Sequence, residues 1–149
     1  MHVALVEPEI PPNTGSIARL CAATGTPLHL IGRLGFSIDD KQLKRAGLDY
    51  WPYVDVRRHA DWAAFAAAVP GRRLGFSARA TRLYTEAAYA PDDVLVFGCE
   101  TRGLPPALKE ELAAHLYAIP ITSQHVRSLN LATAVAVVLY EAIRQTTGR

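Results

Sequence analysis

The sequence is poor in cysteine, in long apolar runs and in net charge, and each shortage excludes a class of protein. Its two cysteines, Cys21 and Cys99, lie far apart and form no CxxC pair, which favours buried reduced thiols over a disulfide. The five histidines show no zinc-binding spacing, so no metal is expected. No apolar stretch reaches the ~18 residues that a membrane helix needs. The first residues meet Glu7 without a basic segment, so we expect no signal peptide and a cytoplasmic location.

The formal net charge of +2 is too small to indicate a nucleic-acid partner by itself. The kind of basic residue is more informative, because thirteen of the sixteen are arginine, whose forked guanidinium suits phosphate groups. The basic residues cluster at four places: Lys41-Lys44-Arg45, Arg57-Arg58, Arg72-Arg73 and Arg79-Arg82. A phosphate-binding surface and a merely solvated surface explain these clusters equally well.

The length of 149 residues, half of them apolar, fits one globular domain that spans residues 1–149. Short β-rich runs alternate with helix-like segments along it. Strands are expected at His2–Val6, Leu28–Ile31, Tyr53–Val56, Arg73–Ser77, Val94–Phe97 and Leu116–Ile119. Helices are expected at Thr14–Ala23, Asp39–Ala46, Asp61–Val69, Pro105–Ala114 and Ser128–Gln145. This alternation predicts an α/β fold with a parallel sheet and helices on both faces.

The last expected helix is apolar on nearly every face between Leu129 and Tyr140, unlike a surface helix with one apolar stripe. Such a helix must be buried on more than one side. In a domain of this size a second copy of the chain covers the other side most simply, so we predict a homodimer. A central helix in a monomeric core is the alternative. Tyr140, deep in this helix, is interpreted as a core residue with a satisfied hydroxyl, and a functional role is the alternative for it.

Three loops that follow expected strands have unusual composition, and the carboxyl ends of parallel strands are where ligands gather. The first loop runs over Glu7–Arg19, where prolines stiffen the entry to a helix. Asn13 or Thr14 is expected to cap that helix, and Gly15 allows a close backbone approach. Arg19 is expected about one turn into the helix, projecting from its N-terminal end. A plain turn and cap does not explain an arginine there, because a cation is favoured at the opposite end of a helix.

The second and third loops follow the strands near the end of the sequence. Residues Phe97–Pro105 hold two glycines, which indicate a tightly folded backbone, and a proline suited to a first helical position. Residues Ile119–Leu131 leave a strand at a proline, continue as a polar loop and reach the apolar helix, which Ser128 or Asn130 is expected to open. Each loop taken alone is a weak signal, since glycine loops and caps are common.

Together the three loops resemble the signature motifs of the SPOUT family of RNA methyltransferases. The resemblance is carried by Asn13-x-Gly15-x-x-x-Arg19, Phe97-Gly98-x-Glu100-x-x-Gly103-Leu104-Pro105, and Ile119-Pro120 with Ser128-Leu129-Asn130-Leu131. The segment Lys41–Tyr50 is similar to the members that methylate the wobble nucleotide of tRNA. This resemblance implies an α/β fold with a C-terminal trefoil knot. It further implies 2′-O-methylation of the ribose of nucleotide 34, a cytidine or modified uridine in the tRNA anticodon stem-loop.

The same resemblance implies S-adenosylmethionine as the cofactor, held largely by backbone groups. Carried over by motif, its contacts are Ser77, Gly98, Ile119, Ser128 and Leu129. Loops rich in backbone donors and acceptors suit adenine, whose faces are apolar and whose edge is polar. Methyl transfer from a sulfonium needs an in-line hydroxyl and help in losing its proton, and it needs no metal.

The resemblance gives the central catalytic role to Arg19. A literal arginine base is unfavourable, since deprotonating a group with a pKa near 13.8 at pH 7 costs about 9 kcal/mol. We therefore expect Arg19 to bind a neighbouring phosphate and the developing oxyanion. Three further residues of the motifs either orient the site or act in the chemistry: Asn13, Glu100 and Asn130.

Two other functions of the same fold stay open at this point: methylation of another tRNA position or of ribosomal RNA, and RNA binding or assembly without turnover. Hydrolysis through Cys99 or Ser128 is disfavoured, because the sequence lacks a GxSxG elbow and a clear His–acid partner. A dinucleotide-binding oxidoreductase is disfavoured because no GxGxxG follows the first strand.

Overall fold

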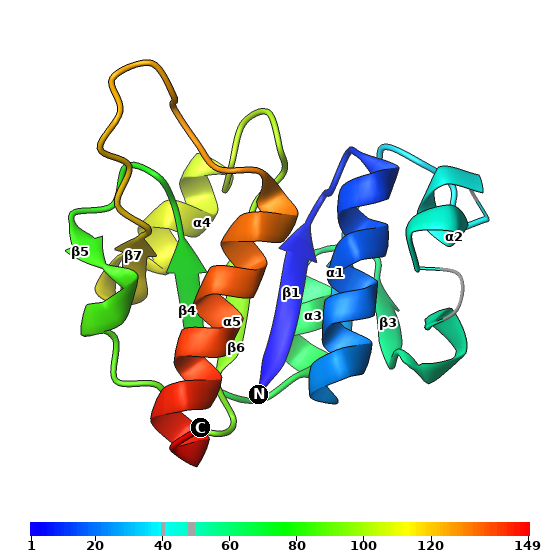
Figure 1. The fold of residues 1–149 in the computed structure, drawn as a ribbon, viewed down its shortest axis with the longest axis horizontal. Helices are drawn as coiled ribbons and strands as arrows, with labels where there is room; N and C mark the ends of the chain where they lie inside the picture. The colour runs from blue at the N-terminus through cyan, green and yellow to red at the C-terminus, as the bar shows by residue number, and fades with distance from the viewer. Residues whose placement is uncertain (40, 48–49) are drawn as a thin grey trace.

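The computed structural model describes residues 1–39, 41–47 and 50–149, and this part of the chain forms a seven-stranded sheet (Figure 1). The strands are β1 (His2–Val6), β2 (Leu28–Ile31), β3 (Val56–His59), β4 (Arg73–Phe76), β5 (Arg82–Leu83), β6 (Val94–Phe97) and β7 (Leu116–Ala118). Their order across the sheet is β3-β2-β1-β6-β4-β7-β5, and all the paired strands are parallel. The predicted parallel α/β fold is confirmed.

Helices cover both faces of the sheet. They are α1 (Pro11–Thr24), α2 (Lys41–Gly47), α3 (Trp62–Ala68), α4 (Pro106–Glu111) and α5 (Leu131–Thr147), with the short 3-10 helices η1 (Trp51–Tyr53), η2 (Tyr84–Glu86) and η3 (Ala113–His115). In Figure 1, α1 and α5 lie side by side in front of the sheet, and α3 and α4 lie behind it. In the described chain, no helix combines the length and the apolar character needed to cross a membrane.

The buried residues divide into two cores because side chains of a strand alternate between its faces. Val3 and Leu5 of β1 join the core beneath α1 and α5. Ala4 and Val6 of the same strand join the core beneath α3 and α4. Central strands covered on both faces are therefore mostly apolar, as β1, β2 and β6 are apart from His2 and His29.

The expected strand at Tyr53–Val56 is wrong in its position. Residues Trp51–Tyr53 form η1, where Pro52 suits the start of a helical turn, and β3 begins only at Val56. The true strand was hard to detect because it is an edge strand whose central residues are two exposed arginines, and charge protects such an edge from further pairing. The two-residue β5 was not expected at all.

The helix expected over Asp39–Ala46 is found as α2, although Asp40 lies outside the described residues. In the motif that ends at Tyr50, Leu48 and Asp49 likewise lie outside them.

The last helix, α5, begins at Leu131, three residues later than expected, so Ser128 lies in the preceding loop. Asn130 is its N-cap and accepts hydrogen bonds from the backbone of the first turn, as one of the two expected capping residues. One face of α5 is fully buried in the core, whereas Tyr140 is 54% exposed. The interpretation of Tyr140 as a core residue is therefore wrong within a single chain.

Candidate active site

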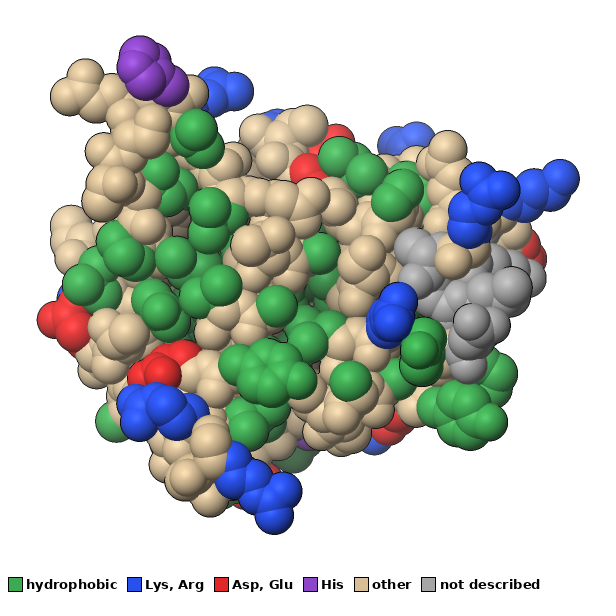
Figure 2. Space-filling model, in the orientation of Figure 1, with side chains coloured by type: hydrophobic (Ala, Val, Ile, Leu, Met, Phe, Trp, Pro, Cys, Tyr) green, Lys and Arg blue, Asp and Glu red, His purple; other side chains and the backbone are tan. Residues whose placement is uncertain are grey.

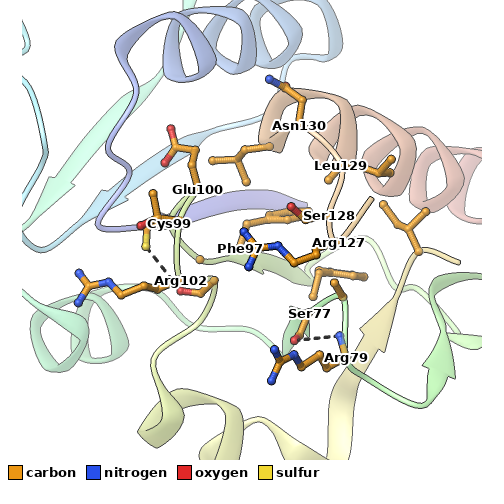
Figure 3. Close-up of a pocket in the computed structure, with 18 of the residues that line it drawn as sticks. Ser77, Arg79, Phe97, Cys99, Glu100, Arg102, Arg127, Ser128, Leu129 and Asn130 are labelled. Atoms are coloured by element: carbon orange, nitrogen blue, oxygen red, sulfur yellow. Dashed lines mark hydrogen bonds between the residues drawn. The ribbon is translucent and has the colours of Figure 1, made fainter. Parts of the chain in front are cut away.

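The loops after β4, β6 and β7 meet at the carboxyl edge of the sheet and enclose a cavity of about 770 Å³ (Figure 3). This size lies within the range of roughly 300 to 1,000 Å³ that is usual for small-molecule sites. Eight of the nine residues singled out from the sequence line it: Asn13, Ser77, Gly98, Glu100, Ile119, Ser128, Leu129 and Asn130. The ninth, Arg19, does not.

The floor of the cavity is apolar and rigid. Phe76 at the end of β4 and Phe97 at the end of β6 stack with ring centroids 5.0 Å apart, and both are buried. Ser77 follows directly, and its backbone N–H donates to the carbonyl of Tyr117 in β7 over 2.9 Å. Strand pairing therefore fixes the position of Ser77.

Gly98 is the tightest point of the site. A Cβ atom at this position would lie 2.0 Å from the carbonyl carbon of Gly103 and 2.1 Å from the nitrogen of Leu104, which no side chain can satisfy. The loop folds back on itself, since Gly103 N–H donates to the Cys99 carbonyl over 2.9 Å. Gly103 itself has a φ of 68°, in the left-handed region. Both glycines of this motif are thus required, for different reasons.

Glu100 holds the first turn of α1 from a distant loop. Its carboxylate accepts hydrogen bonds from the backbone N–H of Glu9 (2.8 Å) and of Ile10 (2.7 Å), and from Asn13 Nδ2 (3.2 Å). The helix has no side-chain cap at Ile10 and starts with two prolines, so the carboxylate accepts from the two amides that precede the helix and lies at its positive end. The expectation that Asn13 or Thr14 caps this helix is wrong, because the prolines move its start to Pro11.

Asn13 and Asn130 link the first and third loops. Asn130 Oδ1 accepts from the backbone of α5, which leaves its Nδ2 to donate to Asn13 Oδ1 over 3.0 Å. Asn13 must then point its Nδ2 toward Glu100, as observed. This chain of hydrogen bonds fixes the orientation of both amides, and it connects the three motifs in one network.

A second carboxylate ties the same loops in the opposite direction. Glu9 Oε1 accepts from the hydroxyl of Thr101 over 2.6 Å and from its backbone N–H over 3.2 Å. The hydrogen bond from the Thr101 side chain is the main cause that lowers the pKa of Glu9 from its usual value. The first and second loops are therefore held together by two reciprocal acid-to-loop contacts.

Four cationic side chains surround the cavity, and the sequence reasoning gave none of them a role in the site: Arg79, Arg102, Lys109 and Arg127. In Figure 3, Arg127 lies near Ser128 and Phe97, while Arg79 and Arg102 lie at separate parts of the cavity. None of the four forms an ion pair with another described residue. Their position within or next to the motif loops was the available signal. Within the described residues, no three His, Cys, Asp or Glu side chains are grouped to hold a metal ion.

Arg19 lies elsewhere, on the outer side of α1. Because the helix begins at Pro11, Arg19 is about 12 Å further along the axis rather than one turn in. Its guanidinium carbon lies 4.7 Å from the centroid of the Tyr50 ring, beside a second hollow that Ala22, Ala23 and Tyr53 complete. One chain therefore does not bring Arg19 to the cavity, and its catalytic role stays a prediction.

The comparisons with known proteins agree with the motifs. Residues 1–140 match the SpoU rRNA Methylase family. The tRNA (cytidine(34)-2′-O)-methyltransferase of Burkholderia pseudomallei is 51% identical over 148 residues, which cover 97% of this chain and 94% of that protein. A chain solved in work described as structural insights into the 2-OH methylation of C/U34 on tRNA superposes with a TM-score of 0.92 at 52% identity, covering 99% of this chain and 97% of that one.

A more distant neighbour is the SpoU methyltransferase AviRb from Streptomyces viridochromogenes, solved in complex with the cofactor AdoMet. It is 27% identical with a TM-score of 0.84, over 97% of this chain and 60% of its own. The family match and the two relatives of about 50% identity each span nearly the whole sequence. The chain therefore belongs to the SpoU rRNA methylase family.

Proposed function

We propose that this protein transfers the methyl group of S-adenosylmethionine to the ribose 2′-hydroxyl of nucleotide 34 of tRNA, a cytidine or modified uridine. The observation that carries the proposal is identity of about 50% over nearly the full length of relatives named for this reaction. The network that joins Asn13, Glu100 and Asn130 at one cavity supports it.

The cavity suits the proposed cofactor. The rings of Phe76 and Phe97 give an apolar floor, and the loops at Ser77, Gly98 and Ser128 present backbone groups at its edge. Two related methyltransferases, 27% and 28% identical, are described as solved with AdoMet bound. When bound, the cofactor supplies a methyl group on a sulfonium. Ser77, Gly98, Ile119, Ser128 and Leu129 would hold it.

In the proposed reaction the ribose 2′-oxygen forms a bond to the methyl carbon as the bond from that carbon to sulfur breaks. The hydroxyl proton leaves to water or to another group at the site as the oxygen attacks. Arg127 and Arg102 at the cavity are placed to bind phosphates on either side of the nucleotide and to hold its ribose in line. Glu100 is engaged by three N–H groups of the α1 start, so we assign it a positioning role rather than that of a base.

We infer that the active form is a homodimer in which Arg19 of one chain serves the cavity of the other. Residues 122–130 are all exposed in the single chain, and this loop, of which residues 127–130 line the cavity, projects from the body in Figure 1. Apolar side chains are exposed beside it at Ile10 (42%) and Leu129 (36%), and further along α5 at Tyr140. Figure 2 shows apolar side chains spread over this face. A second copy would cover them and the exposed loop.

The trefoil knot that the resemblance implies belongs to the same proposal. The close backbone packing of Gly98 against Gly103 and Leu104 is compatible with it.

The proposed reaction is tested with purified protein, labelled S-adenosylmethionine and unmodified tRNA transcripts, followed by mapping of the methylated nucleotide by mass spectrometry. We expect one methyl group per tRNA, on the ribose of nucleotide 34, without added metal. Methylation of a different nucleotide or of ribosomal RNA would favour the alternative function within the same family. Absence of transfer to any RNA would leave only RNA binding. The dimer is tested separately by sedimentation equilibrium at micromolar protein, where a monomer would contradict it.

A further inference from the structure

The hollow beside Arg19 has the composition of a ring-binding surface. Its walls are Arg19 of α1, Tyr50 and Tyr53, and Ala22 and Ala23 complete its lining along the helix. Alanines leave room for a flat group to approach the helix closely. The guanidinium of Arg19 lies over one face of the Tyr50 ring.

The two tyrosines are unusually open to solvent for their position next to a helix. Tyr53 is 78% exposed and Tyr50 is 38% exposed. A single exposed tyrosine needs no explanation, because apolar atoms make up much of any protein surface. Two tyrosines that share a hollow with an arginine form a specific combination, since an aromatic face stacks on a planar ring while a guanidinium binds a phosphate or stacks in turn.

The surroundings of the hollow select an anionic ligand. The helix α2, which packs on α1, carries exposed Lys41 and Arg45. Figure 2 shows lysine and arginine side chains gathered over α2. A nucleotide combines both features, because its base is a planar ring and its phosphate carries negative charge.

The proposed reaction also leaves a nucleobase without a partner. The bases of a single-stranded RNA loop can be splayed from their neighbours, and an unstacked base needs a new surface. The aromatic rings that line the main cavity within the described chain, Phe76 and Phe97, are buried and stack on one another, so neither offers an open face at the rim. Tyr53, in the hollow beside Arg19, is by contrast an exposed aromatic side chain.

From these observations we propose that the hollow of Arg19, Tyr50 and Tyr53 is a stacking site for an unstacked nucleobase of the tRNA anticodon loop. The inference rests on the proposed function, because that function supplies the RNA loop. Tyr53 stacks on the base, Tyr50 holds the guanidinium of Arg19 in place, and Arg19 binds the adjoining phosphate.

The test measures equilibrium binding of a fluorescent synthetic anticodon stem-loop RNA to the full chain by anisotropy. The variants are Tyr53→Leu, which removes the ring but keeps bulk, and Tyr53→Phe, which keeps the ring and removes the hydroxyl. Leu83→Ala, at the opposite edge of the sheet, is the control for a surface apolar residue. We expect Tyr53→Leu to weaken binding about 10-fold or more, and Tyr53→Phe and Leu83→Ala to change it less than about threefold.

A salt titration separates stacking from phosphate binding. Because stacking releases no counterions, Tyr53→Leu should leave the slope of log K against log salt unchanged, whereas Arg19→Ala should reduce it by about 0.7. Unchanged thermal melting of the variants checks that they are folded, and Tyr53→Trp, which should bind at least as well as the native chain, serves if Tyr53→Leu does not fold.

The inference is overturned if Tyr53→Leu binds the RNA like the native chain, if Tyr53→Phe loses as much as Tyr53→Leu, or if the native chain does not bind the stem-loop. The proposed function is judged apart from it, by the position of the methyl group on full-length tRNA. If the native chain methylates nucleotide 34 but the Tyr53 variants bind the RNA like the native chain, only this inference is wrong. If RNA binding depends on Tyr53 but no methyl group is transferred, only the proposed function is wrong.

Discussion

The two loops that face each other across the cavity differ sharply in how they are held. The loop of residues 97–105 is fastened by Glu100 to the start of α1, by a backbone contact between Cys99 and Gly103, and by the buried Leu104. The loop of residues 119–130 is exposed from residue 122 onward. Among the described residues, Asn130 at its end joins it to Asn13 and to the first turn of α5. The loop of residues 97–105 is thus fully held within one chain, whereas the loop of residues 119–130 is not.

We explain this difference, and the distance of Arg19 from the cavity, by the different needs of the cofactor and of the RNA substrate. Cofactor binding needs a rigid wall of backbone groups, which a single chain supplies. In the proposed dimer, a second chain would add Arg19 to the cations already at the cavity and would cover the exposed loop. The first three predictions below each act on one side of this division.

The largest effect is expected from Gly98→Ala in the loop of residues 97–105. The added Cβ would collide with backbone at 2.0 Å, so we expect a loss of more than about 3 kcal/mol in the free energy of unfolding and loss of cofactor binding. Urea unfolding and calorimetry measure both. The matched control is Gly25→Ala, where a φ of 64° strains the backbone but nothing lies within 4 Å, so a cost of about 1 kcal/mol is expected. Equal costs at the two glycines would contradict the role of close packing.

Arg19→Ala should lower turnover but leave cofactor binding unchanged. Because the proposed cofactor contacts all come from the loops that line the cavity, the affinity for S-adenosylmethionine should stay within about twofold of the native value. The turnover number should fall by about 100-fold or more, as expected for a lost cation at a developing oxyanion. Single-turnover kinetics with tRNA and calorimetry with the cofactor separate the two quantities. Near-normal turnover would remove Arg19 from the mechanism.

Glu100→Gln tests whether that carboxylate is an anchor. The amide retains one acceptor oxygen and loses the charge that faces the helix start, so the free energy of unfolding should fall by about 2 kcal/mol. Urea unfolding checks this, with Asn13→Ala expected to cost about half as much. Native stability combined with lost turnover would instead indicate a chemical role for Glu100.

An effect no larger than that of Glu100→Gln concerns acid stability, in a region remote from the cavity. His29 is fully buried between His2 and His59, with ring nitrogens 2.8 and 2.9 Å from theirs. Burial, then the neighbouring His2 and His59, lower the pKa of His29 to about 4. His29 therefore takes up a proton below about pH 6.5 in the unfolded chain but only near pH 4 in the folded chain. The free energy of unfolding falls as the pH drops from about 6.5 toward 4.

At pH 5 this linkage amounts to about 2 kcal/mol relative to pH 7.5. Urea unfolding at the two pH values measures it. A His29→Asn variant, although less stable overall, should lose less on acidification. An equal loss in the two proteins would assign the acid sensitivity to other groups.

Much of the fold was predictable because burial leaves a clear pattern. The strands β1, β2 and β6 are apolar runs in which His2 and His29 are the exceptions, and their positions were predicted without error. The edge strand β3 carries two arginines in place of such a run, so the apolar residues before it were assigned instead. Local propensity could not correct this, because which segment pairs with β2 is decided by tertiary contacts.

The candidate site was predictable as a set of loops but not as a geometry. The motifs brought Gly98, Glu100 and Asn130 to one cavity, yet the role of Glu100 as a remote helix cap depends on α1 starting at Pro11. The place of Arg19 depends on that same start. The contacts of His29 with the two other histidines depend on the register of three strands, which no local pattern encodes.

The most direct test of the central claim mixes two inactive variants. Arg19→Ala has a native cavity, and Ser77→Trp fills its cavity but keeps Arg19. If Arg19 of one chain serves the cavity of the other, dimers that contain one of each variant hold a single intact site. Random mixing should then restore about a quarter of the native methylation of tRNA. No activity above that of the separate variants would show that each chain uses its own Arg19, and would contradict the shared site.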